Sequence, residues 1–214
     1  EKETYAAAKN SVRELLGDCK VIDALSSYEL YEEGIVERPV VCNDEIQTFI
    51  DAGVENLWTY YCCVQGKGVS NRFLAIPPER IRILGVQLYL YQIEGFLHWG
   101  FNFYNSQYSL RPVNPYLITD ADGGFPSGDP FVVYPAADHT AYTSVRLEIF
   151  AEALQDLRAL QRLEEKTDRA FVTALIHEGV EGTITFMDYP GDAAYIRSLR
   201  EKIYRELEQR SGKQ

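Results

Sequence analysis

Short apolar runs, spaced through the first two thirds of the chain, predict buried strands. Each run is four to eight residues long and rich in β-branched or aromatic residues, which is typical of strands buried in a parallel sheet. Polar or glycine-containing segments separate them. The runs are 19–25, 39–42, 56–63, 96–102 and 129–135.

Apolar residues at helical spacing predict helices between and after these runs. Pro77-Pro78 suits a helix start, and Thr143 or Ser144 can cap the longest helix. We place the apolar stripe of that helix on Phe150, Leu154, Leu157 and Leu160. Helix ends are predicted at Gly17, Gly53 and Gly95. The predicted helices are 4–16, 45–52, 78–94, 145–166, 168–178 and 192–209.

The order of strands and helices predicts an α/β fold with parallel strands joined by crossover helices. Polar and aromatic residues follow the strands, as in a (β/α) barrel of the TIM type, but a full barrel has eight strands and about 250 residues. With four or five strands in 214 residues, we expect a partial barrel over residues 1–166. Residues 167–214 are expected to be a helical extension packing on it.

A half-barrel would leave two sheet edges and an apolar inner face open. Either residues outside this chain close the barrel or a second copy covers the opening, so a homo-oligomer is one expectation. The chain begins at Glu1 and not at methionine, which suggests a piece of a longer protein.

Charge and hydropathy narrow the range of partners. The chain has 21 basic and 32 acidic residues, a net charge of −11, so nucleic acid is an unsuitable partner. No apolar run approaches the roughly 20 residues that span a membrane, and the start lacks a signal-peptide pattern. A cytoplasmic location is favoured, although export stays open because an upstream signal would be missing.

Cysteine and histidine usage gives no sign of a metal or cofactor. The four cysteines lack C-x-x-C spacing, and three histidines are too few to suggest a zinc site. The adjacent Cys62 and Cys63 could form a vicinal disulfide, act as a redox pair or serve as small buried hydrophobes. We expect neither cofactor nor metal.

Aromatic residues are the informative excess: 15 tyrosines, 10 phenylalanines and 2 tryptophans. Each buried tyrosine hydroxyl needs a hydrogen-bond partner, so this number suggests rings lining a surface that binds an amphipathic ligand. Sugars are one such ligand.

Four segments in register resemble a known family. They are Trp58–Cys63, Gly95–Asn102, Asp129–Pro135 and Ser144–Glu148, with Asn71, Arg82 and Asp23 in agreement. Over residues 5–163 they are similar to the C-terminal part of the catalytic domains related to glycoside hydrolase family 123, the β-N-acetylgalactosaminidase family. The resemblance implies the C-terminal half of a (β/α) barrel and hydrolysis of a glycosidic bond.

The resemblance also implies a substrate-assisted mechanism, in which the substrate's N-acetyl group is the nucleophile. An adjacent Asp-Glu pair supplies the general acid and orients the acetamido group. That pair lies upstream of the matching part, so we expect it to precede this chain. Asp44-Glu45 is a possible substitute, but its position at a predicted helix start favours capping. After Glu148 the chain also departs from the family pattern, with Ala151-Glu152-Ala153 where Arg-Asp-Gly is common.

The candidate substrate-binding residues lie at or near strand ends. Trp99 could stack on a sugar or belong to the core. Asn102 and Asp23 could hydrogen-bond sugar hydroxyls. At most one of Tyr60 and Tyr61 faces a cleft, because neighbours in a strand point to opposite faces. The candidates are Asp23, Tyr60, Trp99, Asn102, Tyr134 and Arg146.

Arg146 could bind a ligand oxygen or pair with Glu148. We expect Glu148 and His98 to be structural, and the histidines suggest no catalytic triad.

Two functions remain open. The chain could be the substrate-binding portion of a glycoside hydrolase acting on N-acetylhexosaminides. Alternatively, it could be a non-catalytic carbohydrate-binding or interaction module on a partial barrel scaffold. A generic α/β domain whose aromatic residues only fill the core is a third possibility.

Overall fold

The computed structural model of the chain describes residues 2–19 and 21–211. It divides into two compact units. The first consists of the residues up to Tyr60 together with Gln92–Leu97, and the second of Tyr61–Tyr91 together with the residues from His98 onward.

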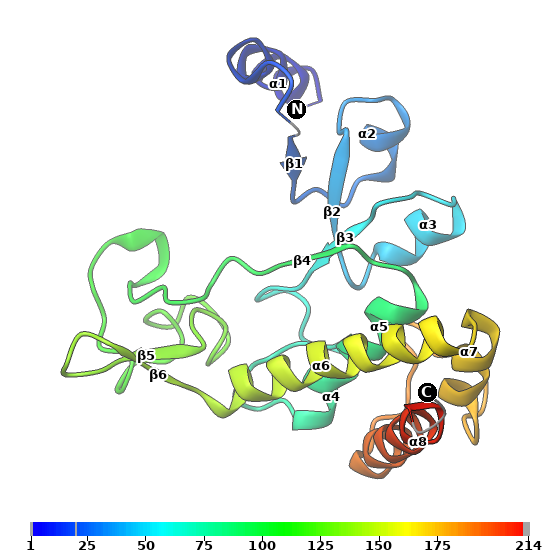
Figure 1. The fold of residues 1–214 in the computed structure, drawn as a ribbon. Helices are drawn as coiled ribbons and strands as arrows, with labels where there is room; N and C mark the ends of the chain where they lie inside the picture. The colour runs from blue at the N-terminus through cyan, green and yellow to red at the C-terminus, as the bar shows by residue number, and fades with distance from the viewer. Residues whose placement is uncertain (1, 20, 212–214) are drawn as a thin grey trace. The chain divides into compact units, whose positions relative to one another are not determined.

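The first unit contains a four-stranded parallel sheet in the order β1-β2-β3-β4 (Figure 1). Each pair of neighbouring strands is parallel, and the sheet curls as half of a (β/α) barrel. The predicted fold class is thereby confirmed. The strands are β1 Ile22–Asp23, β2 Arg38–Cys42, β3 Trp58–Tyr60 and β4 Gly95–Leu97.

Burial explains why β2 and β3 pair in one register. Val40 and Val41 are fully buried, as expected of a central parallel strand covered on both faces. The buried hydroxyl of Thr59 donates to the Val41 carbonyl at 2.8 Å. The next strand, β4, begins at Gly95, where an added Cβ would lie 2.1 Å from the Trp58 ring. Gly95 therefore admits the tryptophan ring and does not end a helix, which corrects that prediction.

Among its described residues, the first unit also contains three helices: α1 Lys2–Leu16, α2 Tyr28–Glu32 and α3 Ile46–Asp51. Helix α2 has only five residues, too few for helical periodicity to reveal it in the sequence. Its Tyr28 ring packs edge-on against Phe49 of α3, with centroids 5.3 Å apart.

The part of the second unit that the structure describes is built on five α-helices: α4 Pro78–Arg82, α5 Leu84–Leu90, α6 Val145–Lys166, α7 Arg169–His177 and α8 Ala193–Ser211. In Figure 1, α6 is the longest of these and contacts the other four. Buried side chains of α5 to α8 form one core. The single helix predicted over 78–94 is in fact the pair α4 and α5. The domain boundary predicted at residue 166 stays a prediction.

The buried face of α6 differs from the predicted stripe. Its buried residues are Arg146, Ala153, Asp156, Leu160 and Leu163. Of the predicted stripe, Leu160 is therefore correctly placed and Leu157 packs partly buried against the same core, whereas Phe150 and Leu154 are half-buried. Packing explains the shift. Helix α5 comes so close at Gly85 that an added Cβ would lie 2.0 Å from the Ala153 carbonyl oxygen. Asp156 is buried because it accepts from Arg82 of α4 at 2.7 Å.

The predicted strand 129–135 pairs differently from the other four. Its last residues form β5 Val133–Pro135, which is antiparallel to β6 Ala141–Thr143. Only residues 136–140 join the two strands, and a parallel pair needs a crossover of a dozen or more residues. The barrel sheet of the described chain therefore has four strands, and the expected role of 129–135 as a barrel strand is corrected.

Candidate functional site

Four of the predicted site residues converge on one segment of the second unit, Gly128–Phe131. The indole N–H of Trp99 donates a hydrogen bond to Asp129, and the backbone of Asn102 forms an isolated antiparallel β-bridge with Phe131. The Tyr134 ring packs edge-on against Phe131 at 5.2 Å between centroids, and Arg146 donates to the carbonyls of Gly128 and Phe131. This segment, which the sequence marked only as the start of a strand, is the centre of the candidate site.

Trp99 combines a partly exposed ring with a hydrogen bond to a buried side chain. It follows β4 by two residues and is 39% exposed. Its indole N–H donates to Oδ2 of Asp129 at 3.1 Å. The rings of Phe103 and Phe125 pack against it at steep angles, with centroids 5.2 and 4.9 Å away. Trp99 is therefore held at one edge while part of its ring faces solvent.

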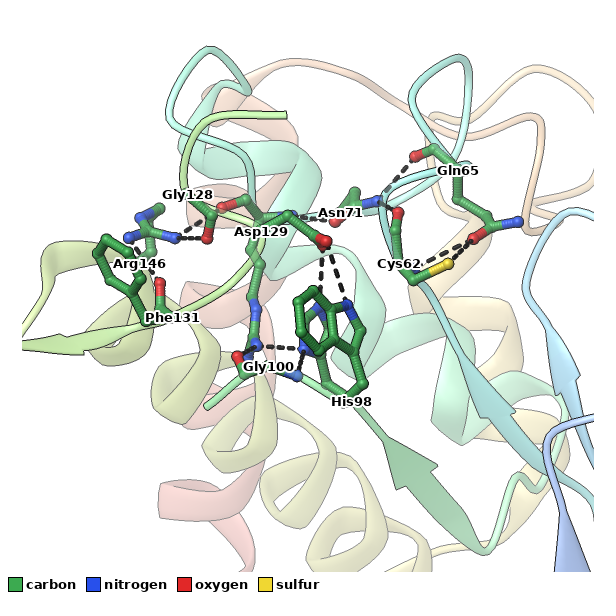
Figure 2. A network of polar contacts seen from close by, with 11 residues as sticks. Cys62, Gln65, Asn71, His98, Gly100, Gly128, Asp129, Phe131 and Arg146 are labelled. Carbon is green, nitrogen blue, oxygen red and sulfur yellow. Dashed lines mark hydrogen bonds and ion pairs between the residues drawn. The ribbon is translucent and has the colours of Figure 1, made fainter. Parts of the chain in front are cut away.

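Asp129 and His98 form the buried base beneath this ring. Asp129 is fully buried, and its Oδ1 faces Nε2 of His98 at 3.4 Å (Figure 2). On the other side of the imidazole, Nδ1 receives the Gly100 N–H at 3.0 Å and a guanidinium N–H of Arg72. Since both of these neighbours are donors, Nδ1 is an acceptor and the proton lies on Nε2, towards Asp129.

The same surroundings keep His98 neutral. Burial is the main cause that lowers the pKa of His98 to about 4, and the nearby Arg72 charge adds to it, while Asp129 opposes it. Burial likewise lowers the pKa of Arg72 to about 10. The site thus holds a neutral imidazole between a buried guanidinium and a buried carboxylate.

Arg146 is buried, and backbone oxygens occupy two of its nitrogens. Its Nη1 donates to Arg72 O at 3.1 Å and to Gly128 O, and its Nη2 donates to Phe131 O at 3.0 Å (Figure 2). One of the two alternatives for Arg146, a pairing with the exposed Glu148, is not among the ion pairs of the described residues. Arg146 joins three separate stretches of backbone here, and its predicted contact with a ligand oxygen stays a prediction.

Asn71 fixes the loop that follows β3. Its amide donates to Cys62 O at 2.9 Å and Gln65 O at 2.8 Å, and its Oδ1 accepts from Arg72 N at 2.7 Å (Figure 2). Cys62 and Cys63 are free thiols, so the vicinal disulfide is absent in this structure. Burial raises the pKa of Cys63 to about 11, which makes its thiol a poor nucleophile at neutral pH.

Asn102 differs in exposure from what the sequence suggested. Asn102 was expected at a buried strand end, but β4 ends at Leu97 and Asn102 is exposed. That premise is wrong, because the chain leaves the strand before Trp99. Tyr134 is half-buried in β5, and the Tyr116 ring lies 5.3 Å from it. Their predicted contacts with a ligand remain predictions.

Asp23 and Tyr60 belong to the first unit. Asp23 ends β1 and accepts a hydrogen bond from the Tyr5 hydroxyl. Burial is the main cause that raises the pKa of Tyr5 to about 12. The two side chains line a cavity of about 200 Å³ together with Ala8, Lys9, Val12 and Val21. Tyr60 is the half-buried last residue of β3. Contacts of both with a sugar stay predictions.

The adjacent carboxylates Asp44 and Glu45 lie between β2 and α3. Glu45 is the residue before the helix, as predicted, but its side chain makes no capping hydrogen bond. Asp44 is half-buried two residues after the last residue of β2. The pair thus lies between β2 and α3, as the predicted strand and helix implied, and the side chain of Glu45 does not cap α3.

The described residues, 2–19 and 21–211, bear on a metal site and on membrane crossing. They contain no group of three or more histidine, cysteine or acidic side chains arranged to hold a metal ion. In the same ranges, no helix has both the length and the apolar character to cross a bilayer.

Sequence reasoning missed Asp129 and Arg72, although both were visible as charged residues beside apolar runs. Asp129 directly precedes the run 130–134, and Arg72 directly precedes Phe73-Leu74. A charged side chain that is buried beside a strand needs a hydrogen-bond or ion-pair partner. This rule could have identified Asp129 and Arg72 as candidates. Their partners are 30 and 26 residues away in sequence, which the sequence could not specify.

Comparisons with known proteins agree with the motifs. The sequence model of the glycoside hydrolase 123 catalytic domain matches residues 1–163. This chain belongs to the glycoside hydrolase 123 family. No curated protein matches this family 123 chain.

Among solved structures, the chain is similar to a family 123 glycoside hydrolase from Clostridium perfringens, described in a study of glycolipid glycan hydrolysis. The TM-score is 0.58 and the identity 15%, and the match covers 95% of this chain. It covers 39% of that enzyme, so the family 123 chain spans about two fifths of its length. At this identity the likeness concerns the fold.

Proposed function

We propose that this chain is the substrate-binding portion of a glycoside hydrolase that acts on N-acetylhexosaminides. In this proposal the proton-transfer pair belongs to a part of the full protein outside these 214 residues. The observation that carries the proposal is Trp99, an anchored ring that is 39% exposed in a member of a glycosidase family.

The chemistry of a sugar fits such a ring. One face of a pyranose consists largely of C–H groups and packs on aromatic surfaces, while its hydroxyls need hydrogen bonds at the periphery. Phe103 and Phe125 extend the apolar surface beside Trp99. Asn102, exposed three residues later, can supply an amide for a hydroxyl. The Clostridium perfringens enzyme, studied for glycolipid glycan hydrolysis, supports a glycan substrate.

Binding can be measured by titrating the purified chain with N-acetylgalactosamine and N-acetylglucosamine. Removing the ring in Trp99→Ala should cost about 1–2 kcal/mol, roughly a five- to thirtyfold loss of affinity. Tyr204→Ala is the matched control, because this ring on α8 has a similar exposure of 42%. Equal affinities of the two variants, or no binding by the parent, would contradict the proposal.

Hydrolysis tests the other part of the proposal. The chain alone should not cleave aryl N-acetylhexosaminides, and a longer version of the protein that contains an upstream Asp-Glu pair should cleave them. Turnover by the chain alone that disappears in Glu45→Gln would identify Glu45, the residue before α3, as the general acid. It would contradict the proposal that the proton-transfer pair lies outside these 214 residues.

A further inference from the structure

We propose that Asp129 is a positioning residue that fixes the Trp99 ring for sugar stacking, and that His98 and Arg72 fix Asp129 in turn. This inference rests on the proposed function, because it gives the Trp99 ring a ligand. Its structural basis is a chain of contacts from Arg72 to the imidazole, from the imidazole to the carboxylate, and from the carboxylate to the indole N–H.

A fully buried carboxylate requires an explanation. Taking a carboxylate out of water is costly unless donors replace the water. Asp129 is fully buried, and two ring nitrogens face it: Trp99 Nε1 at 3.1 Å and His98 Nε2 at 3.4 Å. A core tryptophan alone would not need a charged partner, since a backbone carbonyl would satisfy its single N–H.

The backbone at Gly100 allows this geometry. An added Cβ at Gly100 would lie 2.8 Å from the carbonyl oxygens of Asp129 and Pro130, so only glycine permits so close an approach. Consecutive residues in an extended strand point to opposite faces. Because the chain leaves β4 at Leu97, His98 and Trp99 instead both reach one carboxylate.

The imidazole cannot exchange its tautomer without losing contacts. Its Nδ1 accepts from Gly100 N and from Arg72, so the Nε2 proton must point at Asp129. Arg72 is itself fixed, since its guanidinium also donates to Gly100 O. The carboxylate lies with Oδ1 towards His98 and Oδ2 towards Trp99, and of these two contacts only the one with the indole N–H has hydrogen-bond geometry.

Fixing the indole edge orients the exposed part of the ring before a ligand arrives. A free ring would lose rotational freedom on binding, and that cost corresponds to a roughly two- to tenfold loss of affinity. A merely structural Asp129 would affect the stability of the protein and the exchange of the indole N–H without changing the affinity for a ligand that stacks on Trp99.

The first measurement needs no variant of Asp129. Trp58 and Trp99 are the only tryptophans of the chain, so ¹⁵N labelling gives two indole signals, which Trp58→Phe assigns. Although Trp99 is 39% exposed, its indole N–H should exchange with solvent much more slowly than that of free tryptophan. Exchange as fast as in free tryptophan would overturn the proposal, even if no Asp129 variant folds.

The second measurement is a double-mutant cycle with N-acetylgalactosamine as the probe. Asp129→Asn should speed indole exchange and weaken binding two- to tenfold in the parent. In a Trp99→Phe background, which has no N–H to hold, the same change should leave affinity unaltered. The control Asp138→Asn alters an exposed carboxylate in the β5–β6 turn and should change neither readout.

The outcomes separate the two proposals. If N-acetylgalactosamine does not bind the parent, the proposed function fails, while indole exchange still decides whether Asp129 holds Trp99. If Asp129→Asn speeds exchange but leaves affinity unchanged, the positioning role in binding is overturned. If Asp129→Asn weakens binding equally with and without the indole N–H, Asp129 does not act through Trp99.

Discussion

His98 should make the stability of the second unit depend on pH between about 4 and 6.5. In the folded protein, burial and the neighbouring donors lower the pKa of His98 to about 4, from an ordinary value of 6.5. Between these two pH values, His98 is mostly protonated in the unfolded chain and mostly neutral in the folded protein. The contribution of the neutral His98 to the free energy of unfolding is therefore complete above pH 6.5 and is lost as the pH falls towards 4.

The magnitude follows from the same values. A pKa difference of one unit corresponds to about 1.36 kcal/mol. The full difference between the folded protein and the unfolded chain therefore corresponds to about 3 kcal/mol of unfolding free energy. Lowering the pH from 7 to 4.5 should remove about 2 kcal/mol of it. The His98 side chain is only 4% exposed, so solvent screening reduces this effect little.

Urea unfolding at pH 7 and pH 4.5 can test this prediction, followed by Trp99 fluorescence in a Trp58→Phe background. Other groups also titrate in this range, so the comparison is with His98→Gln, which keeps an amide in place of the imidazole and cannot titrate. The parent should lose about 2 kcal/mol more than this variant between the two pH values. His139→Gln, which replaces an exposed histidine in a turn, is the matched control and should lose the same unfolding free energy as the parent between the two pH values.

The reasoning is refuted if the parent and His98→Gln lose the same unfolding free energy between pH 7 and pH 4.5. A larger loss in His98→Gln would mean that the imidazole carries its proton in the folded state. The tautomer assignment, and the support that it gives to Asp129, would then be wrong as well.

Three substitutions, measured by urea or thermal unfolding, test a close backbone approach, a core contact and a helix cap. Gly95→Val should cost about 1–3 kcal/mol or prevent folding, because the new side chain meets the Trp58 ring; wild-type stability would contradict the close approach. Leu160→Ala, at a fully buried position, should cost about 2–5 kcal/mol, and a loss below 1 kcal/mol would show that α6 packs differently. Asp168→Ala removes the cap that accepts from Phe171 N at 2.8 Å and should cost about 1 kcal/mol; no change would mean that water replaces it.

Local sequence patterns were sufficient to predict the parallel strands. Short apolar runs with helices between them leave few topologies, and all four strands from 22–23 to 95–97 pair in parallel. The cap of the longest helix was also a local feature. Ser144 accepts from Leu147 N at 3.3 Å, as its position before a periodic stretch predicted.

Local patterns failed where a distant segment decided the outcome. The apolar stripe of α6 was only partly right, because Gly85 and Arg82, about 70 residues earlier, set which face is most deeply buried. The antiparallel course of 133–135 depends on its pairing with β6. Gly95, an apparent helix end, is explained by the ring of Trp58.

The sequence by itself determined the fold class, the family and the aromatic residue at the centre of the candidate site, because these depend on spacing and residue type along the chain. Only the tertiary structure placed Asp129 and His98 beneath Trp99. The physical reason is that a buried carboxylate must find its donors wherever the fold brings them. Here one donor is Trp99, 30 residues away, and another donor to the same cluster is Arg72.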